Sequence, residues 1–353
     1  MLRFLSVFVV LMIVQGCGAE EDRADVTFSG TVTQDQSTGW NIVQLNAEDP
    51  ENPGKNISIK VVPEGGSNLF SINVGGHDLV RPTGDLNRFK KGMGGIPVMF
   101  PTPNRVRNQT YVFMGETHTM TFPGDDKPKR LHGLVWDDSA WKFSEPVTTP
   151  DGISFSTWYV FDESNPRFPG YPFRNTLTVT YTLTADRVRI GYEVENQDSK
   201  PLGFGFGLHP FWNLIGSKEG MHIQADIPNR MLGENKLPSG ELAPVADTEY
   251  SLIEPTLLSE LKLDDVYFGA TPESNVRITY DTIGLEIVQR ASADFTHVVV
   301  YTPNDAVCVE NQTCSTDMHN LYDKGFEKES NLQILDPGKT AGGHIDYLFE
   351  LKE

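Results

Sequence analysis

The chain has 353 residues, and its 29 Lys and Arg against 48 Asp and Glu give a formal net charge of −19. This balance argues against nucleic acid as a partner, because such affinity depends on basic side chains that neutralise phosphates. It also disfavours polyanionic substrates, unless a local basic pocket exists. The 32 Gly and 23 Pro are spread through the chain and favour many short strands over long helices.

The first segment has the pattern of an export signal. Arg3 precedes an apolar run over residues 4–14, which is too short to span a membrane comfortably. The run ends in Val-Gln-Gly before Cys17, which resembles the bacterial lipobox, where the chain is cut before a Cys that is then lipidated. Several acyl chains on one residue give stable anchoring. A plain secretory peptide with an incidental Cys17 is the alternative.

These signals divide the chain into three parts. We expect a lipoprotein signal peptide over residues 1–16, a lipidated Cys with a flexible acidic tether over 17–26, and one domain over 27–353. The protein is then expected to be lipid-anchored at the bacterial cell envelope, on the periplasmic or outer-membrane face. The anchor is its only expected membrane contact.

Alternating apolar and polar residues predict β-strands along the body of the chain. The period-two runs lie at residues 57–61, 70–74, 177–183, 188–194, 276–280 and 285–287. The turn over 184–187 predicts a hairpin between the third and fourth runs. The best helical candidate is short, at Thr256 to Leu261 after Pro255. No linker divides this region, so one large antiparallel β-sandwich, of the all-β class, is the simplest architecture.

Two segments in the first half of the body carry candidate binding residues. A Gly- and Pro-rich path over 94–103 leads to Arg105, whose guanidinium can donate to substrate oxygens. His132 precedes a Gly, and Trp136 follows it closely. An aromatic face beside a polar donor suits a sugar ring. A surface arginine and a structural histidine are the alternatives.

Two further segments follow. The run over 203–207 alternates Gly and Phe, which sacrifices strand packing unless something approaches the backbone closely, and His209 stands at its end among aromatics. Asp264 and Asp265 come just after the short helical candidate, where an Asp pair is most often a turn device.

Glu310 is the one carboxylate in an otherwise uncharged, strand-like run over 307–313. A charge in such a run is paired, exposed in a cleft or used, and the alternative is the solvent face of an edge strand. Cys308 and Cys314 flank it, either as free thiols or as a disulfide that requires the chain to double back.

No His or Cys pair has the spacing of a zinc site, and no phosphate-cradling glycine loop or Ser nucleophile elbow occurs. We therefore expect neither a metal nor another cofactor. A Glu, two His, an Arg and an Asp with aromatics suit proton transfer on a neutral polyol.

Taken in order, these segments resemble the aldose 1-epimerases, or galactose mutarotases. The pieces are Gly-Gly-Ile-Pro-Val-Met-Phe-Pro with Asn104-Arg105, then His132-Gly133, His209 before Asn213-Leu214, Leu263-Asp264-Asp265-Val266-Tyr267, Val309-Glu310-Asn311-Gln312-Thr313, and Leu335-Asp336-Pro337-Gly338-Lys339. The resemblance implies a galactose mutarotase-like supersandwich and no cofactor.

The resemblance also implies roles for individual residues. Glu310 would take the proton from the C1 hydroxyl as general base, and His209 would protonate the ring oxygen as general acid. Arg105 and His132 would bind and polarise substrate oxygens, and Asp264, preferred over Asp265, would hold further hydroxyls. Trp136 completes the expected substrate-binding set.

Three functions remain open at this point. The first is a mutarotase acting on a neutral aldose, as a monomer. The second is a hexose-6-phosphate 1-epimerase, with Arg107 or Lys90 and Lys91 as phosphate ligands. The third is a sugar-binding lipoprotein without turnover. Export and the acidic charge favour the neutral sugar over the phosphate.

Overall fold

The structure of the protein is a computed structural model that describes residues 25–81, 84–90, 94–125 and 130–352, without the side chains of Arg88 and Lys90. The predicted signal peptide, Cys17 and nearly all of the tether lie outside these ranges, as does Lys91. Within them, no helix has both the length and the apolar character needed to cross a membrane.

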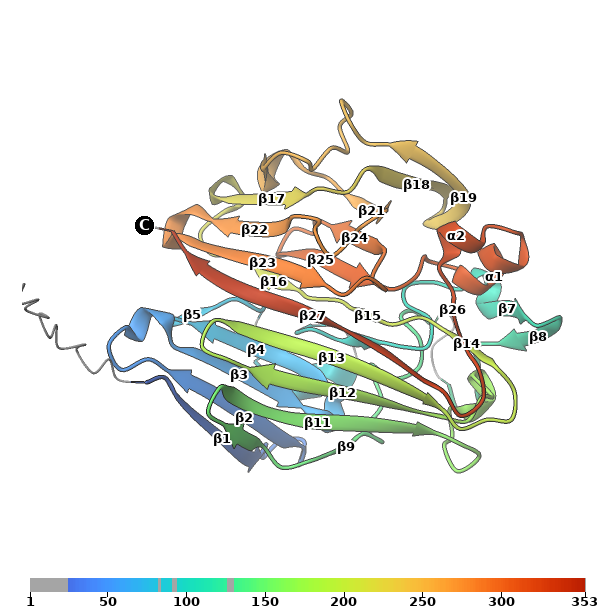
Figure 1. Cartoon of the computed structure of the whole chain (residues 1–353), viewed down its shortest axis with the longest axis horizontal. Helices are drawn as coiled ribbons and strands as arrows, with labels where there is room; N and C mark the ends of the chain where they lie inside the picture. Colours follow the sequence, from blue (N-terminus) through green and yellow to red (C-terminus); the bar gives the residue numbers. More distant parts are fainter. Residues whose placement is uncertain (1–24, 82–83, 91–93, 126–129, 353) are drawn as a thin grey trace, which may run out of the picture.

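A ten-stranded sheet forms one layer of the molecule (Figure 1). Its order is β10-β11-β12-β13-β27-β23-β22-β17-β20, with β9 paired to β11. The bounds are β9 (Lys142–Phe143), β10 (Val147–Thr149), β11 (Gly152–Phe161), β12 (Asn175–Leu183), β13 (Arg187–Asn196), β17 (Met221–Ala225), β20 (Thr256–Leu257), β22 (Val276–Tyr280), β23 (Leu285–Ala291) and β27 (Thr340–Leu351). The C-terminal strand β27 therefore joins the two halves of the sheet.

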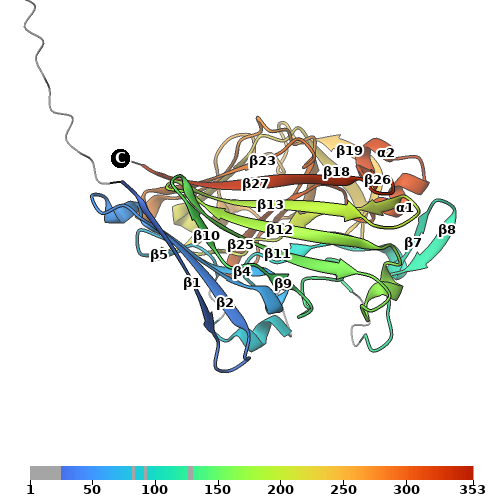
Figure 2. The same ribbon diagram turned by 60° about the horizontal axis from the view of Figure 1, so that its bottom comes forward.

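A five-stranded and an eight-stranded sheet form the second layer. The five strands run in chain order, β1 (Thr27–Gln34), β2 (Asn41–Glu48), β3 (Ile57–Val62), β4 (Asn68–Val74) and β5 (His77–Asp78). Strands β1 and β2 cross β11 at one side of the molecule (Figure 2). The eight-stranded sheet holds β6 (Val98–Met99), β15 (Gly207–Leu208), β16 (Trp212–Asn213), β18 (Asn229–Glu234), β19 (Leu237–Pro244), β21 (Asp264–Phe268), β24 (His297–Tyr301) and β25 (Ala306–Gln312).

The remaining elements are short. Two small sheets pair β7 (Thr110–Phe113) with β8 (Glu116–Thr119) and β14 (Leu202–Phe204) with β26 (Gln333–Leu335). Two helices, α1 (Met318–Asp323) and α2 (Glu327–Ser330), follow β25. The strand-to-strand ladders in the described parts of the chain are antiparallel, so the predicted all-β antiparallel sandwich is confirmed.

Two local predictions have different outcomes. The hairpin is confirmed, because β12 pairs with β13 and Leu183 stands opposite Val188. The helix at Thr256 to Leu261 is wrong: the chain adds β20 to the ten-stranded sheet and then makes a single 3₁₀ turn at Leu258–Glu260. Pairing with β17 satisfies the backbone hydrogen-bonding groups there. This tertiary contact outweighs the weak helix propensity of so short a segment.

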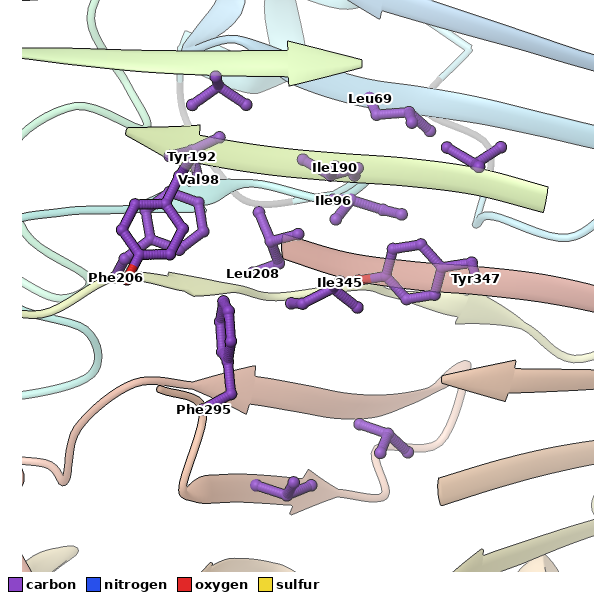
Figure 3. Packing of buried hydrophobic residues seen from close by; sticks show 14 of the residues in the cluster. Leu69, Ile96, Val98, Ile190, Tyr192, Phe206, Leu208, Phe295, Ile345 and Tyr347 are labelled. Carbon is purple, nitrogen blue, oxygen red and sulfur yellow. The ribbon is translucent and has the colours of Figure 1, made fainter. Parts of the chain in front are cut away.

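The main core lies between the two layers (Figure 3). Leu208 of β15 and Val98 of β6 face Ile190 of β13 and Ile345 of β27. At one end the rings of Tyr192 and Phe206 stack with centroids 4.2 Å apart. Successive side chains of a strand point to opposite faces of the sheet. In the eight-stranded sheet, the residues next to each core residue along its strand therefore point to the outer face. That outer face carries the candidate site.

Candidate active site

Strand β25 places Glu310 on the outer face of the eight-stranded sheet. Val307 and Val309 belong to the core, so Cys308, Glu310 and Gln312 point the other way. The strand is interior rather than an edge, because β24 pairs with one side of it and β15 and β16 with the other. The side chain of Glu310 is only 2% exposed. The alternative of a solvent-facing carboxylate on an edge strand is therefore wrong.

His209 reaches Glu310 from the segment between β15 and β16. Its backbone N–H donates to the carbonyl of Pro97 at 3.1 Å, while the preceding Leu208 points into the core. The ring Nε2 lies 3.2 Å from Oε1 of Glu310, and the His209 side chain is 7% exposed. An imidazole and a carboxyl group therefore share one buried contact, which is the central feature of the site.

The alternating glycines before His209 allow close packing by the protein itself. A Cβ on Gly205 would lie 2.2 Å from Sγ of Cys314 and 2.7 Å from Sδ of Met318. A Cβ on Gly203 would lie 2.7 Å from the ring of Phe113. The sequence prediction that something approaches this backbone is confirmed, and here those groups are core side chains of the same chain.

Burial shifts both members of the pair toward their neutral forms. It lowers the pKa of His209 well below its ordinary value, with smaller contributions from the charges of His132 and Arg81. It raises the pKa of Glu310 well above its ordinary value; the charge of Asp264 adds to this rise, and the hydrogen bond from Gln312 opposes it. Because the two groups are in contact, their titrations are coupled.

His132 lies beside His209 in a constrained loop. Its backbone has a φ of 61°, and its N–H donates to the carbonyl of Asn104 at 2.7 Å. Its ring meets that of His209 edge to face, with centroids 5.1 Å apart. Burial, and then the charge of Arg105, lowers the pKa of His132 to about 3, so this imidazole is neutral at physiological pH.

Arg105 lies close enough to His132 to affect its pKa, and it lines a neighbouring cavity. Its Nη1 donates to Oδ1 of Asn104 at 2.8 Å, and Asn104 itself has a φ of 61°. The carbonyl of Arg105 accepts from the backbone N–H of buried Asp317, whose carboxylate accepts from Arg107. Asp317 therefore fixes the loop that presents Arg105, and the guanidinium of Arg107 is bonded to Asp317.

A cavity of about 230 Å³ adjoins the buried pair. Arg105, Asp264 and Val299 line it, and Val299 stands opposite Glu310 in the β24–β25 ladder. Lys236, at the tip of the β18–β19 hairpin, lies 3.0 Å from the Asp264 carboxylate. Asp265 is instead bonded to Arg230 at 3.0 Å. The cavity lining does not include Glu310 or His209, which are both buried.

Trp136 is buried behind the His132 loop. It is 7% exposed, and its indole N–H donates to the carbonyl of Leu131 at 2.9 Å. This contact supports the loop that carries His132, and the role of Trp136 in substrate binding stays a prediction.

Other site features came only with the structure. Gln312 donates to Oε2 of Glu310 at 2.9 Å, and the period-two spacing of the two residues would have been a usable sequence signal. Asp317 had no such signal. Cys308 and Cys314 are free buried thiols, so the disulfide alternative is not realised. In the described ranges, no cluster of three or more His, Cys, Asp or Glu side chains is arranged to hold a metal ion.

Fold and site together define a galactose mutarotase-like β-sandwich with a buried His–Glu pair beside an arginine. The solved structure of a galactose mutarotase-like protein from Clostridium acetobutylicum superposes with a TM-score of 0.79 at 17% identity, covering 93% of this chain and 99% of that one. Galactose 1-epimerase from Lactobacillus acidophilus NCFM gives 0.71, also at 17% identity, covering 93% and 100%. The chain belongs to the aldose 1-epimerase family, whose sequence profile matches residues 52–348.

Curated relatives have higher sequence identity, but over smaller parts of the chain. The galactose mutarotase of Sus scrofa is 28% identical over 167 residues, which are 44% of this chain and 44% of that protein. The Escherichia coli K12 protein YihR is 23% identical over 69% of this chain and 75% of its own length. The maltose epimerase of Levilactobacillus brevis is 23% identical over 57% and 66%. The match thus spans less than half of the pig enzyme.

Proposed function

We propose that the protein interconverts the α and β anomers of a neutral aldose by acid–base ring opening and reclosure. The observation that carries this proposal is the 3.2 Å contact between Nε2 of His209 and Oε1 of Glu310 in a buried site. The two oxygens that exchange protons in this reaction, the C1 hydroxyl and the ring oxygen, share one carbon. A base and an acid in direct contact can therefore each reach one of them.

The His209–Glu310 pair holds one exchangeable proton before and after each step, so the proton transfers balance. In the charged form of the pair, Glu310 takes the proton from the C1 hydroxyl, the C1–O5 bond breaks as the C1 carbonyl forms, and His209 gives its proton to O5. Rotation about C1–C2 presents the other face of the aldehyde. In the return step His209 takes the O5 proton, O5 attacks C1, and Glu310 returns a proton to O1. Binding places hydroxyl groups against the pair, which favours the charged form over the neutral one.

Three further residues act on the substrate in this proposal. Arg105 donates to the oxygen that carries developing charge, and neutral His132 hydrogen-bonds a neighbouring oxygen without adding a positive charge. Asp264, in the wall of the adjoining cavity, accepts from sugar hydroxyls. Lys236 already contacts that carboxylate, so the β18–β19 hairpin tip stands where it would meet the bound sugar.

A neutral sugar is favoured over its 6-phosphate by the charges around the site. Lys236 and Arg230 are each bonded to an aspartate, and Arg107 is bonded to Asp317. The formal charge of the whole chain is −19. Anionic substrates would approach against this field.

Polarimetry tests the proposal directly. Freshly dissolved α-glucose, α-galactose and α-maltose are followed with the wild-type protein, with Glu310→Gln and with no protein, and glucose 6-phosphate is followed by a coupled assay. We expect faster mutarotation of at least one neutral sugar, abolished by Glu310→Gln. A clear preference for the phosphate would favour a hexose-6-phosphate 1-epimerase. Sugar binding without turnover would favour a binding lipoprotein.

We also propose that the protein is a monomer attached to the bacterial cell envelope by lipidated Cys17. The support is the apolar run that ends in Val-Gln-Gly-Cys. Mass spectrometry of the mature N-terminus from a native host is expected to find an acylated Cys17, and Cys17→Ala is expected to release the protein from membranes. A mature chain that begins elsewhere without acylation would overturn the proposed lipid anchor. Light scattering of the non-lipidated protein in detergent-free solution would test whether it is a monomer.

A further inference from the structure

His209 is held from one side by an aromatic ring rather than by a hydrogen bond. The imidazole of His209 and the ring of Phe211 are nearly parallel, at 6°, with centroids 4.4 Å apart. The buried Nδ1 of His209 has no hydrogen-bond partner within the described part of the chain. In most catalytic histidines, a bond at the second nitrogen sets the orientation of the ring. In this protein, stacking on the Phe211 ring constrains the orientation of the His209 imidazole instead.

Arg81 extends the stack. Its guanidinium carbon lies 4.4 Å from the centroid of the Phe211 ring. A six-membered ring has no room for two flat groups on one face at this distance, so Arg81 and His209 lie on opposite faces of Phe211. The backbones of the two residues are also joined, because the N–H of Arg81 donates to the carbonyl of Phe211 at 2.8 Å.

Arg81 connects this stack back to the strand that carries Glu310. Its Nη1 lies 3.0 Å from Oδ2 of Asp305, in the turn just before β25. Phe211 packs against Ala306 and Cys308 at the start of the same strand. Contacts therefore run from Asp305 before β25 through Arg81 and Phe211 to His209. His209 in turn contacts Glu310 on β25.

We propose that Phe211 and Arg81 are positioning residues for the acid–base pair: Phe211 sets the plane of the His209 imidazole, and Arg81, anchored by Asp305, holds Phe211 against it. Neither residue exchanges a proton with the sugar. The positioning role deepens the proposed function and rests on it, since it fixes the geometry of the same reaction. It predicts that loss of the ring affects turnover more than substrate binding.

The electrostatics agree with this geometry. Burial is the main cause that lowers the pKa of His209, followed by the charges of His132 and Arg81. The groups that face His209 are Glu310 from β25, His132 from its loop and Arg81 through the Phe211 ring. Arg81 thus acts on His209 both through the stack and through its charge.

Matched substitutions test the proposal in the full chain. Phe211→Leu removes the flat face while keeping an apolar side chain, and Phe211→Tyr keeps the ring. For Phe211→Leu we expect kcat to fall at least about tenfold with KM nearly unchanged, because small misplacements of catalytic groups cost rate. Phe211→Tyr should retain most of the wild-type kcat. Arg81→Met should lower kcat less than Phe211→Leu, and Arg81→Lys should restore part of the loss.

An NMR measurement separates positioning from general damage. Proteins labelled with ¹⁵N-histidine report the tautomer and ring order of His209, assigned with His209→Asn. Phe211→Leu is expected to broaden or shift the His209 nitrogen signals while leaving those of His297 in place, and Phe211→Tyr is expected to leave both unchanged. Wild-type kcat together with unchanged His209 signals in Phe211→Leu would overturn the proposal.

Two controls keep the outcome decisive. If Phe211→Leu fails to fold, as judged by near-UV circular dichroism, the Arg81→Met and Arg81→Lys pair decides, and equal kcat in both and in wild type would overturn the proposal. If the wild-type protein is inactive on every sugar, the proposed function fails. The His209 NMR signals then decide the positioning role alone.

Discussion

Gln312 and Glu310 lie on the same face of β25, and Nε2 of Gln312 donates a hydrogen bond to Oε2 of Glu310 at 2.9 Å. The other carboxyl oxygen of Glu310 contacts His209. Gln312 is fully buried and cannot turn to solvent for another partner. Its bond favours the charged carboxylate and opposes the rise that burial imposes on the pKa of Glu310.

Replacement of Gln312 by Leu should therefore move the pH profile. Without the donor, the pKa of Glu310 rises further, so the charged base forms only at higher pH. The acidic limb of kcat/KM should shift to higher pH relative to wild type. Profiles of Gln312→Leu and of the distant control Gln44→Leu, measured by polarimetry, check this. A limb that stays in place, or moves to lower pH, would contradict the assigned role of the bond.

The acid–base pair itself should be sensitive to minimal changes. Glu310→Gln keeps shape but cannot accept the proton, and His209→Asn keeps a donor that cannot cycle one. Each should lower kcat by at least about 100-fold, since general acid–base assistance has this magnitude. The double variant should lose far less than the product, because the groups act as a unit. The exposed Glu193→Gln is the control, and near-wild-type kcat in Glu310→Gln would refute the assignment.

Asp264 and Asp265 should differ, although they are adjacent. Asp264 lines the cavity beside Arg105 and contacts Lys236, whereas Asp265 is bonded to Arg230. Asp264→Ala, like Arg105→Ala, should raise KM about tenfold or more and also lower kcat, because a hydrogen bond to a charged group is worth about 1.5–3 kcal/mol. Asp265→Ala should change KM little. Initial-rate polarimetry over a range of sugar concentrations distinguishes the two, and a larger effect at Asp265 would reverse the choice.

Three buried histidines should make the protein sensitive to acid. Burial lowers the pKa of His132 and His297 to about 3 and that of His319 to about 4. Between these values and about 6.5 the unfolded chain binds protons that the folded chain does not, so stability falls as pH falls. Their joint contribution approaches about 4 kcal/mol per pH unit, at about 1.4 for each group.

Urea unfolding at several pH values between 7 and 4.5 measures this slope, which is expected to be smaller by about one proton in His297→Gln. An unchanged slope in His297→Gln would show that this histidine is not kept neutral by burial.

Gly205 should tolerate no side chain. Its Cβ would lie 2.2 Å from Sγ of Cys314 and 2.7 Å from Sδ of Met318, and both side chains are buried in the core. Gly205→Ala should lower the free energy of unfolding by about 1–3 kcal/mol or more, the usual cost of overpacking. Gly54→Ala, with nothing within 4 Å of its Cβ, is the matched control in denaturant unfolding. Equal stability of the two variants would rule out the tight packing.

The fold class and most of the candidate residues can be predicted from the amino-acid sequence. Alternating apolar residues identified the long strands, because a half-buried strand repeats every two residues; β12 and β13, with their turn, followed directly. Glu310 is a lone charge in an apolar run, which indicates a functional or paired carboxylate because an unpaired buried charge is costly. The short helical candidate at Thr256 failed because propensity in so few residues is weak against an available strand partner.

The contacts between these residues depend on the tertiary structure. His209 and Glu310 are far apart in the chain, and their 3.2 Å contact depends on β15 and β16 pairing with β25. The stack of Arg81 and Phe211 on His209 depends on a further long-range pairing, and no local pattern encodes it. Local spacing fixes which face a side chain occupies. The partner on that face is set by strand order, which arises from the packing of the whole sandwich.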